Sequence, residues 1–434
     1  MKYLKQKDRA ILAIVLLAIF ALCCLYVLIV PGYSESLTYE RERDEEENLY
    51  SIVKGIKDKE ETIVVIPPRY YSIVITHIGE GAFKDCTNIK SVKIPSTVTH
   101  IGKEAFSGCT SLESITIPAS VTYIGENAFA NCPSLKKISV SSKNQNYKSI
   151  DGDLYTKDGK TLIKYTAKNV ENSFEIPHGV EQICTTAFDT SAKNVTIPAS
   201  VTSISTAFAG LTTLETVIFE KGTTIGAIGL GAFQYCTSLK SIEIPASVQM
   251  ISRESFDGCS NLKSVTFEQG SKLNYIDSYA FSGCSSLETI TVPVGVTKIG
   301  WGAFSSCTSL KSVLFGANNV LETIDQYAFM DCTSLANIQL PQSTTSIWKE
   351  AFANCTSLTE LTIPQSVEWI GVNAFSGCTN LTSVYVESRT WKVQYPNGYD
   401  SKNISFGDDN ATTRAMVAEY LVADYADREW RKVS

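Results

Sequence analysis

The chain has 434 residues, which is enough for two or three ordinary domains or for one extended repeat domain whose core grows with its length. Its hydrophobic fraction of 44% excludes general disorder. With 19% charged residues and a net charge of −7, the chain offers no basic surface of the kind that binds nucleic acid. We therefore expect an ordered protein without a nucleic-acid partner.

Residues 1–31 predict a cytoplasmic stub and a transmembrane anchor. The uncharged run from Ile11 to Val30 is as long as a helix needs to cross a bilayer. Basic residues precede the run and an acidic cluster at 40–47 follows it, so the positive-inside tendency places the rest of the chain outside the cell. A cleaved signal peptide is the alternative, but the run is longer than a usual signal core and no A-x-A-like site follows it. We expect a single-pass protein of the cell membrane with a cytoplasmic amino terminus.

Residues 32–60 are polar and dense in charge, which predicts a solvated, flexible stalk. The next segment, 61–77, contains the apolar stretch Ile63–Pro67. We expect this segment to close the first coil of the following region as an unpaired half-repeat, which forms an N-terminal cap.

A repeat of mostly 23 or 25 residues runs through the following part of the chain, with one step of 20 and one of 59 across an inserted segment. Its template is I-G-x-x-A-F-x-x-C-x-x-L-x-x-I-x-I-P, and residues 105–118, AFSGCTSLESITIP, are a typical copy. The twelve template phenylalanines are Phe83, Phe106, Phe129, Phe188, Phe208, Phe233, Phe256, Phe281, Phe304, Phe329, Phe352 and Phe375.

Each copy predicts one short strand and one short helical turn. The alternating end, as in Ser241–Pro245, fits a strand with one buried face, and the proline marks where the strand ends. The A-F-x-x-C-x-x-L half has apolar residues at i, i+1, i+4 and i+7, which fits a short helical turn. A coil of this size cannot bury its apolar face alone. We therefore expect the copies to stack as a β-rich repeat solenoid with one shared core.

The template resembles the BspA-like class of leucine-rich repeats, which recurs in surface proteins of anaerobic and host-associated bacteria and of some protozoan parasites. The resemblance covers residues 78–386, and it implies a leucine-rich-repeat solenoid that acts in recognition at the cell surface. Two copies depart from the pattern. Phe188 is followed by Ser191 in place of the cysteine, and the next copy has Leu211 there, so we expect these two coils to be the least regular.

Residues 141–178 interrupt the period as an insert. Lys157–Lys160, which reads KDGK, lies between two strand-like stretches and predicts a β-hairpin. The insert is either a structural excursion of the solenoid or an additional contact surface. It contains three tyrosines that could offer aromatic contact area to a ligand, Tyr147, Tyr155 and Tyr165.

Ten of the thirteen cysteines occupy the template position, so none of them is singled out for catalysis. A disulfide framework, a metal array and a column of buried thiols are the three alternatives. We favour buried thiols, because Leu211 indicates that a coil closes without sulfur and because cysteine is among the most buried residue types. No C-x-x-C or H-E-x-x-H motif occurs, and we expect neither a metal site nor a cofactor. The ten cysteines are Cys86, Cys109, Cys132, Cys236, Cys259, Cys284, Cys307, Cys332, Cys355 and Cys378.

The histidines do not predict a catalytic pair with these cysteines. His77 and His100 occupy the same slot in consecutive copies, so they should lie side by side on the surface while the cysteines point inward. No G-x-S-x-G motif, phosphate-binding loop or kinase motif set occurs. We expect no enzymatic activity. An extracellular hydrolase is the alternative that these patterns favour least.

The residue between the two buried positions of each strand should face outward and form a stripe along the sheet. Its mostly short, hydroxylic side chains suit adaptable hydrogen bonding to a protein or glycan ligand. The alternative is a solvated face that binds nothing. The predicted binding residues are Lys93, Thr116, Ser139, Thr196, Glu243, Thr266, Thr291, Gln339, Thr362 and Tyr385, and the same column contains Ile218 and Leu314.

Residues 387–434 predict a C-terminal cap. Several apolar residues of the segment 411–427 share one helical face, so we expect a helix that folds over the last coil, with Trp391 and Trp430 assisting the closure. Together, these features predict a cell-surface recognition or adhesion protein. A structural spacer of the cell envelope without a specific ligand is the competing interpretation.

Overall fold

The computed structural model describes residues 33–166, 173–188, 192–387, 390–394, 402–405, 410–424 and 426–433. These residues form a β-solenoid that contains little helix. The predicted anchor, Ile11 to Val30, lies outside the described residues. Within the described ranges, no helix is long and apolar enough to cross a membrane.

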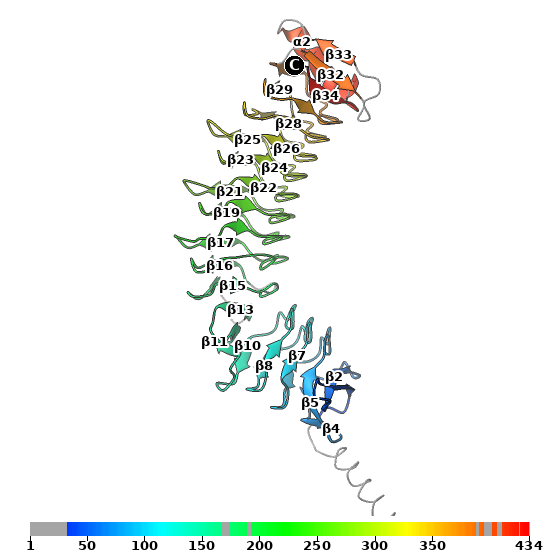
Figure 1. Ribbon diagram of the computed structural model, residues 1–434, viewed down its shortest axis with the longest axis vertical. Coiled ribbons are helices and arrows are strands. Elements are labelled where there is room, and N and C mark those ends of the chain that lie inside the picture. Colours follow the sequence, from blue (N-terminus) through cyan, green and yellow to red (C-terminus); the bar gives the residue numbers. More distant parts are fainter. Residues whose placement is uncertain are drawn as a thin grey trace, which may run out of the picture. The chain divides into compact units, whose positions relative to one another are not determined.

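The described residues divide into two compact units. Unit 1 contains residues 33–157 and 166, and unit 2 contains residues 158–165 and the described residues from 173 onward. In each unit, successive coils stack and pair in parallel through short strands, so each coil supplies strands to two sheets (Figure 1).

In unit 1, one sheet has the order β1-β2-β5-β7-β9, with β4 paired to β5, and a second sheet has the order β10-β8-β6-β3. The strands are β1 (Leu37–Arg43), β2 (Leu49–Ile56), β3 (Ile63–Val65), β4 (Arg69–Tyr70), β5 (Ile73–Ile78), β6 (Ser91–Lys93), β7 (His100–Ile101), β8 (Ser114–Ile117), β9 (Tyr123–Ile124), β10 (Lys137–Val140), β11 (Tyr147–Ile150) and β12 (Asp153–Thr156).

In unit 2, the outer sheet that carries the predicted stripe has the order β14-β16-β17-β19-β21-β23-β25-β27, and β29 and β31 continue the same column through a bridge between Gln339 and Thr362. The strands of this column are β14 (Ser173–Glu175), β16 (Asn194–Ile197), β17 (Thr216–Phe219), β19 (Ser241–Ile244), β21 (Ser264–Phe267), β23 (Thr289–Val292), β25 (Ser312–Phe315), β27 (Asn337–Ile338), β29 (Glu360–Ile363) and β31 (Ser383–Val386).

A second sheet of unit 2 has the order β18-β20-β22-β24-β26-β28-β30-β34-β32-β33. Strand β13 (Thr161–Lys164) pairs in parallel with β15 (Gln182–Ile183). The second sheet contains β18 (Ala227–Ile228), β20 (Met250–Ile251), β22 (Tyr275–Ile276), β24 (Lys298–Ile299), β26 (Thr323–Ile324), β28 (Ser346–Ile347), β30 (Trp369–Ile370), β32 (Thr390–Gln394), β33 (Lys402–Ser405) and β34 (Glu429–Lys432).

The A-F half of each coil is a series of tight turns, and the predicted helical turn is wrong. In the first full coil, Cys86 N–H donates to the Phe83 carbonyl within the coil (3.2 Å), whereas Phe83 N–H donates to Ala105 of the next coil (2.8 Å). Gly81 and Asp85 have left-handed backbone angles, with φ 59° and 57°. These angles allow some N–H groups to donate within the coil and others to donate to the next coil. A helix would use all of these amide groups internally and would leave none to join neighbouring coils.

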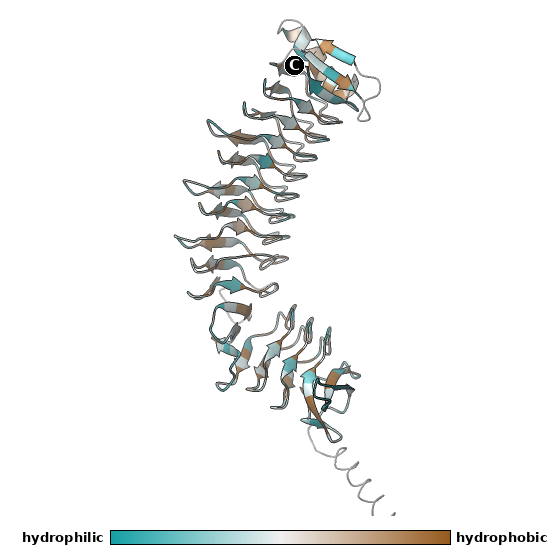
Figure 2. Ribbon diagram, in the orientation of Figure 1, coloured by the Kyte–Doolittle hydropathy of each residue, from teal (hydrophilic) through white to brown (hydrophobic). Residues whose placement is uncertain are grey.

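The template phenylalanines form the centre of the core. In unit 2, Phe304 lies between Phe281 and Phe329 with ring centroids 5.2 and 5.3 Å away and interplanar angles of 8° and 2°. All three rings are fully buried, and each burial contributes about 2–3 kcal/mol. Figure 2 shows hydrophobic and hydrophilic residues mixed along the strand ribbons, as one-sided burial requires. The shared core within a unit is therefore confirmed.

Of the two coils that were expected to be least regular, the ring stacking of the Phe188 coil is irregular, whereas the Leu211 coil, which contains Phe208, stacks regularly on the next coil. The rings of Phe188 and Phe208 are tilted by 31°, whereas those of Phe208 and Phe233 are within 4° of parallel. Ser191, which was expected at the cysteine position, lies outside the described residues. Leu211 fills its slot and is buried.

Residues 37–56 form an antiparallel β-hairpin, so the predicted stalk over 32–60 is wrong for this segment. Strand β2 pairs in parallel with β5, and β1 lies at the edge of that sheet. Leu37 and Val53 are buried, and the charges that suggested a stalk lie on the exposed end of β1. Charged side chains on an edge strand discourage pairing with another chain, so the hairpin caps the solenoid. Within the predicted half-repeat at 61–77, β3 pairs in parallel with β6, and β5 pairs with β2, so the hairpin and not this segment ends the sheet that contains β5.

The C-terminal segment contains a helix that is shorter than the predicted 411–427. Helix α2 (Ala411–Glu419) has Asn410 as its N-cap, continues as a π-helical turn over Tyr420–Asp424, and contacts β31. Three strands that were not predicted complete the cap. Strand β34 pairs antiparallel with β30 and β32, and Trp391 and Trp430 are almost completely buried with their rings 6.4 Å apart.

Candidate ligand-binding face

The predicted stripe lies on the outer face of the sheets as expected. In unit 2, strand register places Glu243 opposite Thr266, Thr291 opposite Leu314, and Thr362 opposite Tyr385. In unit 1, Thr116 lies opposite Ser139 and Lys93 is exposed one coil earlier. Exposed members are Lys93, Thr116, Glu243, Thr266, Thr291 and Gln339, and half-buried members are Ser139, Thr196, Thr362 and Tyr385.

The stripe of unit 2 ends under the cap. The Arg414 guanidinium of α2 lies 5.5 Å from the centroid of the Tyr385 ring, which is a cation–π distance. Tyr385 is therefore engaged by the cap and is less available to a ligand than the rest of the stripe.

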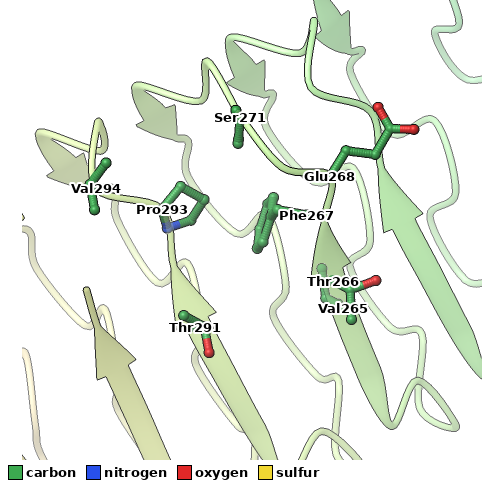
Figure 3. A pocket seen from close by; sticks show the side chains of 9 residues that line it. Val265, Thr266, Phe267, Glu268, Ser271, Thr291, Pro293 and Val294 are labelled. Atoms are coloured by element: carbon green, nitrogen blue, oxygen red, sulfur yellow. The ribbon is translucent and has the colours of Figure 1, made fainter. Parts of the chain in front are cut away.

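A groove of about 430 Å³ adjoins the stripe between β21 and β23 (Figure 3). Thr266 and Thr291 of the stripe line one part of the groove, and Phe267 and Pro293 line another. The half-exposed ring of Phe267 and the exposed Val294 give the groove an apolar floor beside two exposed hydroxyls. Such a combination of apolar area with polar groups at its rim is typical of binding surfaces.

The groove has a signal in the sequence that the repeat template hid. In alternate coils of unit 2 the strand ends in phenylalanine without a following proline, at Phe219, Phe267 and Phe315. The coils between them end in Ile244-Pro245 and Val292-Pro293. Those aliphatic residues are fully buried, whereas the three phenylalanines are only partly buried, so the longer coils place aromatic area at the surface.

The insert does not offer its tyrosines as predicted. Tyr155 and Tyr165 are buried, at 1% and 3% exposed, and the Tyr165 ring packs 4.2 Å from Phe174. The Tyr147 hydroxyl accepts a hydrogen bond from the Ile124 N–H at 2.9 Å. The insert is therefore a structural excursion of the solenoid and not an additional contact surface. Its rings pack in the interior because burying such large apolar rings is favourable.

The insert contains a second Asp-Gly turn in addition to the predicted KDGK segment. Strands β11 and β12 pair antiparallel around Asp151 and Gly152, whose φ angles of 51° and 91° fit the Asp-Gly turn that favours hairpins. The predicted KDGK segment does connect two strands, β12 and β13.

The cysteines form the predicted column of buried thiols. All ten template cysteines are buried, and in nine of them the thiol donates to the carbonyl of the template phenylalanine one coil earlier, as Cys259 does to Phe233 at 3.0 Å. Burial raises the pKa of the Cys236 and Cys307 thiols to about 12. They remain protonated at neutral pH, and a protonated buried thiol is not a nucleophile.

The two template histidines lie side by side as predicted. The rings of His77 and His100 stack at 4.3 Å between Tyr50 and Tyr123. Burial, together with the neighbouring His100, lowers the pKa of His77 to about 4. Thr76 and Thr99 hydroxyls lie 2.8 Å from the Nδ1 atoms of the histidines that follow them. Both rings are half-buried, so the column is a packed feature of the sheet rather than an open row.

The fold and the repeat geometry define a leucine-rich-repeat β-solenoid. The family model for the BspA type leucine rich repeat region matches in six copies over residues 71–157, 163–272, 226–324 and 315–404, which is more than half of the chain. The chain therefore belongs to the BspA-type leucine-rich repeat family, and the predicted resemblance is confirmed. A search of curated proteins found no match.

Several solved structures are similar to this chain. A leucine-rich repeat protein from Bacteroides ovatus is 27% identical, with 82% of this chain and 94% of that chain covered and a TM-score of 0.45. A leucine rich cell surface protein from Faecalibacterium prausnitzii is 24% identical, with 66% and 94% covered and a TM-score of 0.35. The pneumococcal vaccine antigen PcpA is 17% identical, with 82% and 98% covered and a TM-score of 0.38.

Proposed function

We propose that the chain is a cell-surface recognition protein that binds an extracellular protein or glycan through the stripe face of unit 2. The single observation that carries the proposal is the groove beside the stripe, where the exposed Thr266 and Thr291 hydroxyls adjoin the half-exposed Phe267 ring. Strand pairing fixes the backbone beneath them, so a ligand would meet a surface that is already ordered.

Membership of a repeat family supports a binding role rather than catalysis. Stacked coils create extended surfaces that suit recognition of a large partner. The groups on this face are hydroxyls, apolar rings and a few charges, which bind but do not activate a bond. The location outside the cell is part of the proposal and depends on the uncharged run from Ile11 to Val30.

The proposal is tested with a binding screen of the full chain in detergent. Immobilised extracellular-matrix proteins, glycans and cell-wall fractions serve as probes. We expect at least one of them to bind. The double variant Thr266→Lys/Thr291→Lys should weaken that binding by about tenfold or more, because long charged side chains would fill the groove.

The matched control is Thr212→Lys/Thr308→Lys, which adds the same charge at two exposed threonines outside the stripe. The control variant should bind like the unmodified chain. No binding to any probe, or binding that both double variants leave unchanged, would favour a structural spacer of the cell envelope.

A further inference from the structure

We propose that Tyr279, Trp301 and Tyr327 form a second binding site, a platform that stacks against the sugar rings of a neutral, hydroxyl-rich glycan. The three residues follow β22, β24 and β26, which lie on the other side of each coil from β21, β23 and β25 (Figure 1). The platform is therefore distinct from the stripe face, and it does not depend on the function proposed for that face.

The three rings form a continuous aromatic surface. The Trp301 ring centroid lies 5.7 Å from that of Tyr279 and 6.0 Å from that of Tyr327, with interplanar angles of 38° and 32°. Trp301 is 44% exposed, which is unusual for such a large apolar side chain, and both tyrosines are half-exposed. Aromatic rings that remain at the surface of a folded domain are typical of recognition sites.

The backbone holds the platform in place. Tyr279 N–H donates to the Trp301 carbonyl at 2.8 Å, and Tyr327 N–H donates to the Lys349 carbonyl at 3.1 Å. Between them, Gly302 has φ +58°, and a Cβ built on it would come within 2.7 Å of the Tyr279 ring. Because Gly302 has no side chain, the Tyr279 ring packs directly against its backbone. This contact holds the Tyr279 ring in place before a ligand arrives.

The tyrosines occupy a slot of the repeat whose backbone is left-handed in every coil of unit 2. Tyr279 and Tyr327 have φ 56° and 59°, in the left-handed region that is unfavourable for bulky side chains. The slot keeps this backbone whatever residue occupies it, and its occupants in the other coils of unit 2 include Thr206, Gly231, Glu254, Gly302, Glu350 and Asn373. Because the slot accepts side chains as different as Gly231, Glu254 and Asn373, the fold does not require an aromatic ring there. Two tyrosines beside one exposed tryptophan are therefore better explained by recognition than by folding.

The polar groups of the same coils favour a neutral glycan. Lys298 pairs with Asp325 at 2.8 Å, and Lys349, whose ammonium lies 5.7 Å from the Tyr327 ring centroid, pairs with Glu350 at 3.2 Å. These ion pairs present both donors and acceptors, which the hydroxyls of a sugar can satisfy while its C–H face packs on the rings. A nucleic acid would instead require a basic groove.

A proline-rich peptide is the other ligand that aromatic surfaces commonly bind. Proline lacks a backbone N–H, so consecutive prolines have no backbone donor for the Asp325 and Glu350 carboxylates. These carboxylates therefore favour the glycan, and the peptide becomes an outcome of the test.

The experiment measures binding of the full chain in detergent to cellohexaose, xylohexaose, mannohexaose and chitohexaose, with decaproline as the peptide probe, by calorimetry. We expect at least one hexasaccharide to bind. Trp301→Ala should weaken this binding by about tenfold, as loss of a central aromatic contact does. Tyr279→Asn should weaken it similarly while leaving the unfolding temperature unchanged or higher, because asparagine tolerates the left-handed backbone.

The matched control is Leu230→Ala, which removes an exposed apolar side chain from the slot that Trp301 occupies in its own coil. This control should bind like the unmodified chain. The proposal is overturned if no hexasaccharide binds at millimolar concentration, or if Trp301→Ala binds them unchanged. It is also overturned if decaproline alone binds and Trp301→Ala abolishes that binding.

Discussion

The sulfur atom of Cys307 lies 3.1 Å from the carbonyl oxygen of Phe281, one coil earlier in the chain, and donates a hydrogen bond to it across the coil boundary. The Cys284 N–H reaches the same carbonyl from within its own coil at 3.2 Å. Since burial raises the pKa of the Cys307 thiol to about 12, the donor proton is present at neutral pH. The repeated cysteine is therefore a structural residue that links each coil to the preceding one.

Replacing Cys307 by alanine should lower the free energy of unfolding by about 1–2 kcal/mol, because the variant loses a hydrogen bond and leaves a small cavity. Chemical denaturation measures the change. Lys272→Ala, at an exposed side chain, is the control and should stay within about 0.5 kcal/mol of the unmodified protein. Equal midpoints for both variants would contradict a structural role for the thiol.

The two kinds of phenylalanine should respond differently to truncation. Phe281→Ala removes a fully buried ring from the core and should cost about 3–5 kcal/mol. Phe267→Ala removes a half-exposed ring from the groove and should cost about 1 kcal/mol. Denaturation of the two variants side by side makes the comparison. A similar cost for both would mean that Phe267 belongs to the core rather than to the groove.

The stacked histidines should make stability depend on pH. The folded-state pKa of His77 is about 4 and its ordinary value is 6.5, so the unfolded chain binds more protons between these values. The stabilising effect of the neutral ring is complete above pH 6.5 and declines as the pH falls toward 4. For this half-exposed ring the loss should be about 1 kcal/mol after allowance for solvent screening.

His77→Phe keeps a stacked ring without a titrating group, so it tests the histidine effect directly. Unfolding temperatures of the variant and the unmodified protein are compared at pH 7.5 and pH 4.5. The variant should lose less stability between the two values. Parallel losses would show that protonation of His77 is not linked to folding.

Residues 33–56 should behave as a cap and not as a spacer. Replacing them with a glycine-serine linker of equal length removes β1 and β2 and exposes the edge of β5. We expect a lower unfolding temperature and self-association in size-exclusion chromatography, because an uncovered strand edge pairs with other chains. A monomeric variant of unchanged stability would restore the stalk interpretation.

The repeat template predicted the coil, its core and its outer stripe. These features are predictable because buried positions such as Phe281 and Cys307 hold apolar side chains, whereas exposed positions such as Thr291 hold polar ones. It did not predict the second strand of each coil. A two-residue strand such as Met250–Ile251 is too short for alternation to be recognised. The A-F-x-x-C-x-x-L half, which contains the turns at Gly81 and Asp85, has a spacing of apolar residues that also fits a helical turn. Only hydrogen bonding to the next coil distinguishes a series of tight turns from a helix.

Other predictions were wrong where the composition of a segment did not indicate its place in the fold. The charges of Glu40 to Arg43 indicated solvent, which is correct, but they lie on an edge strand and not on a flexible stalk. Tyr155 and Tyr165 appeared as spare aromatic area because the insert breaks the repeat, whereas the fold uses both rings as core. Phe267 stands at the last apolar position of the template strand and Trp301 at a variable position, so both fit the repeat and neither was recognised as part of a surface site.

Thiol labelling of the folded protein tests the central claim most directly, because the claim is that similar coils stack with their cysteines inside a shared core. Native protein is treated with iodoacetamide at pH 8 and analysed by peptide mass spectrometry, with a urea-denatured sample alongside. The ten template cysteines should remain unmodified in the native sample and react fully in urea. Rapid labelling of most of these cysteines in the native protein would contradict the account.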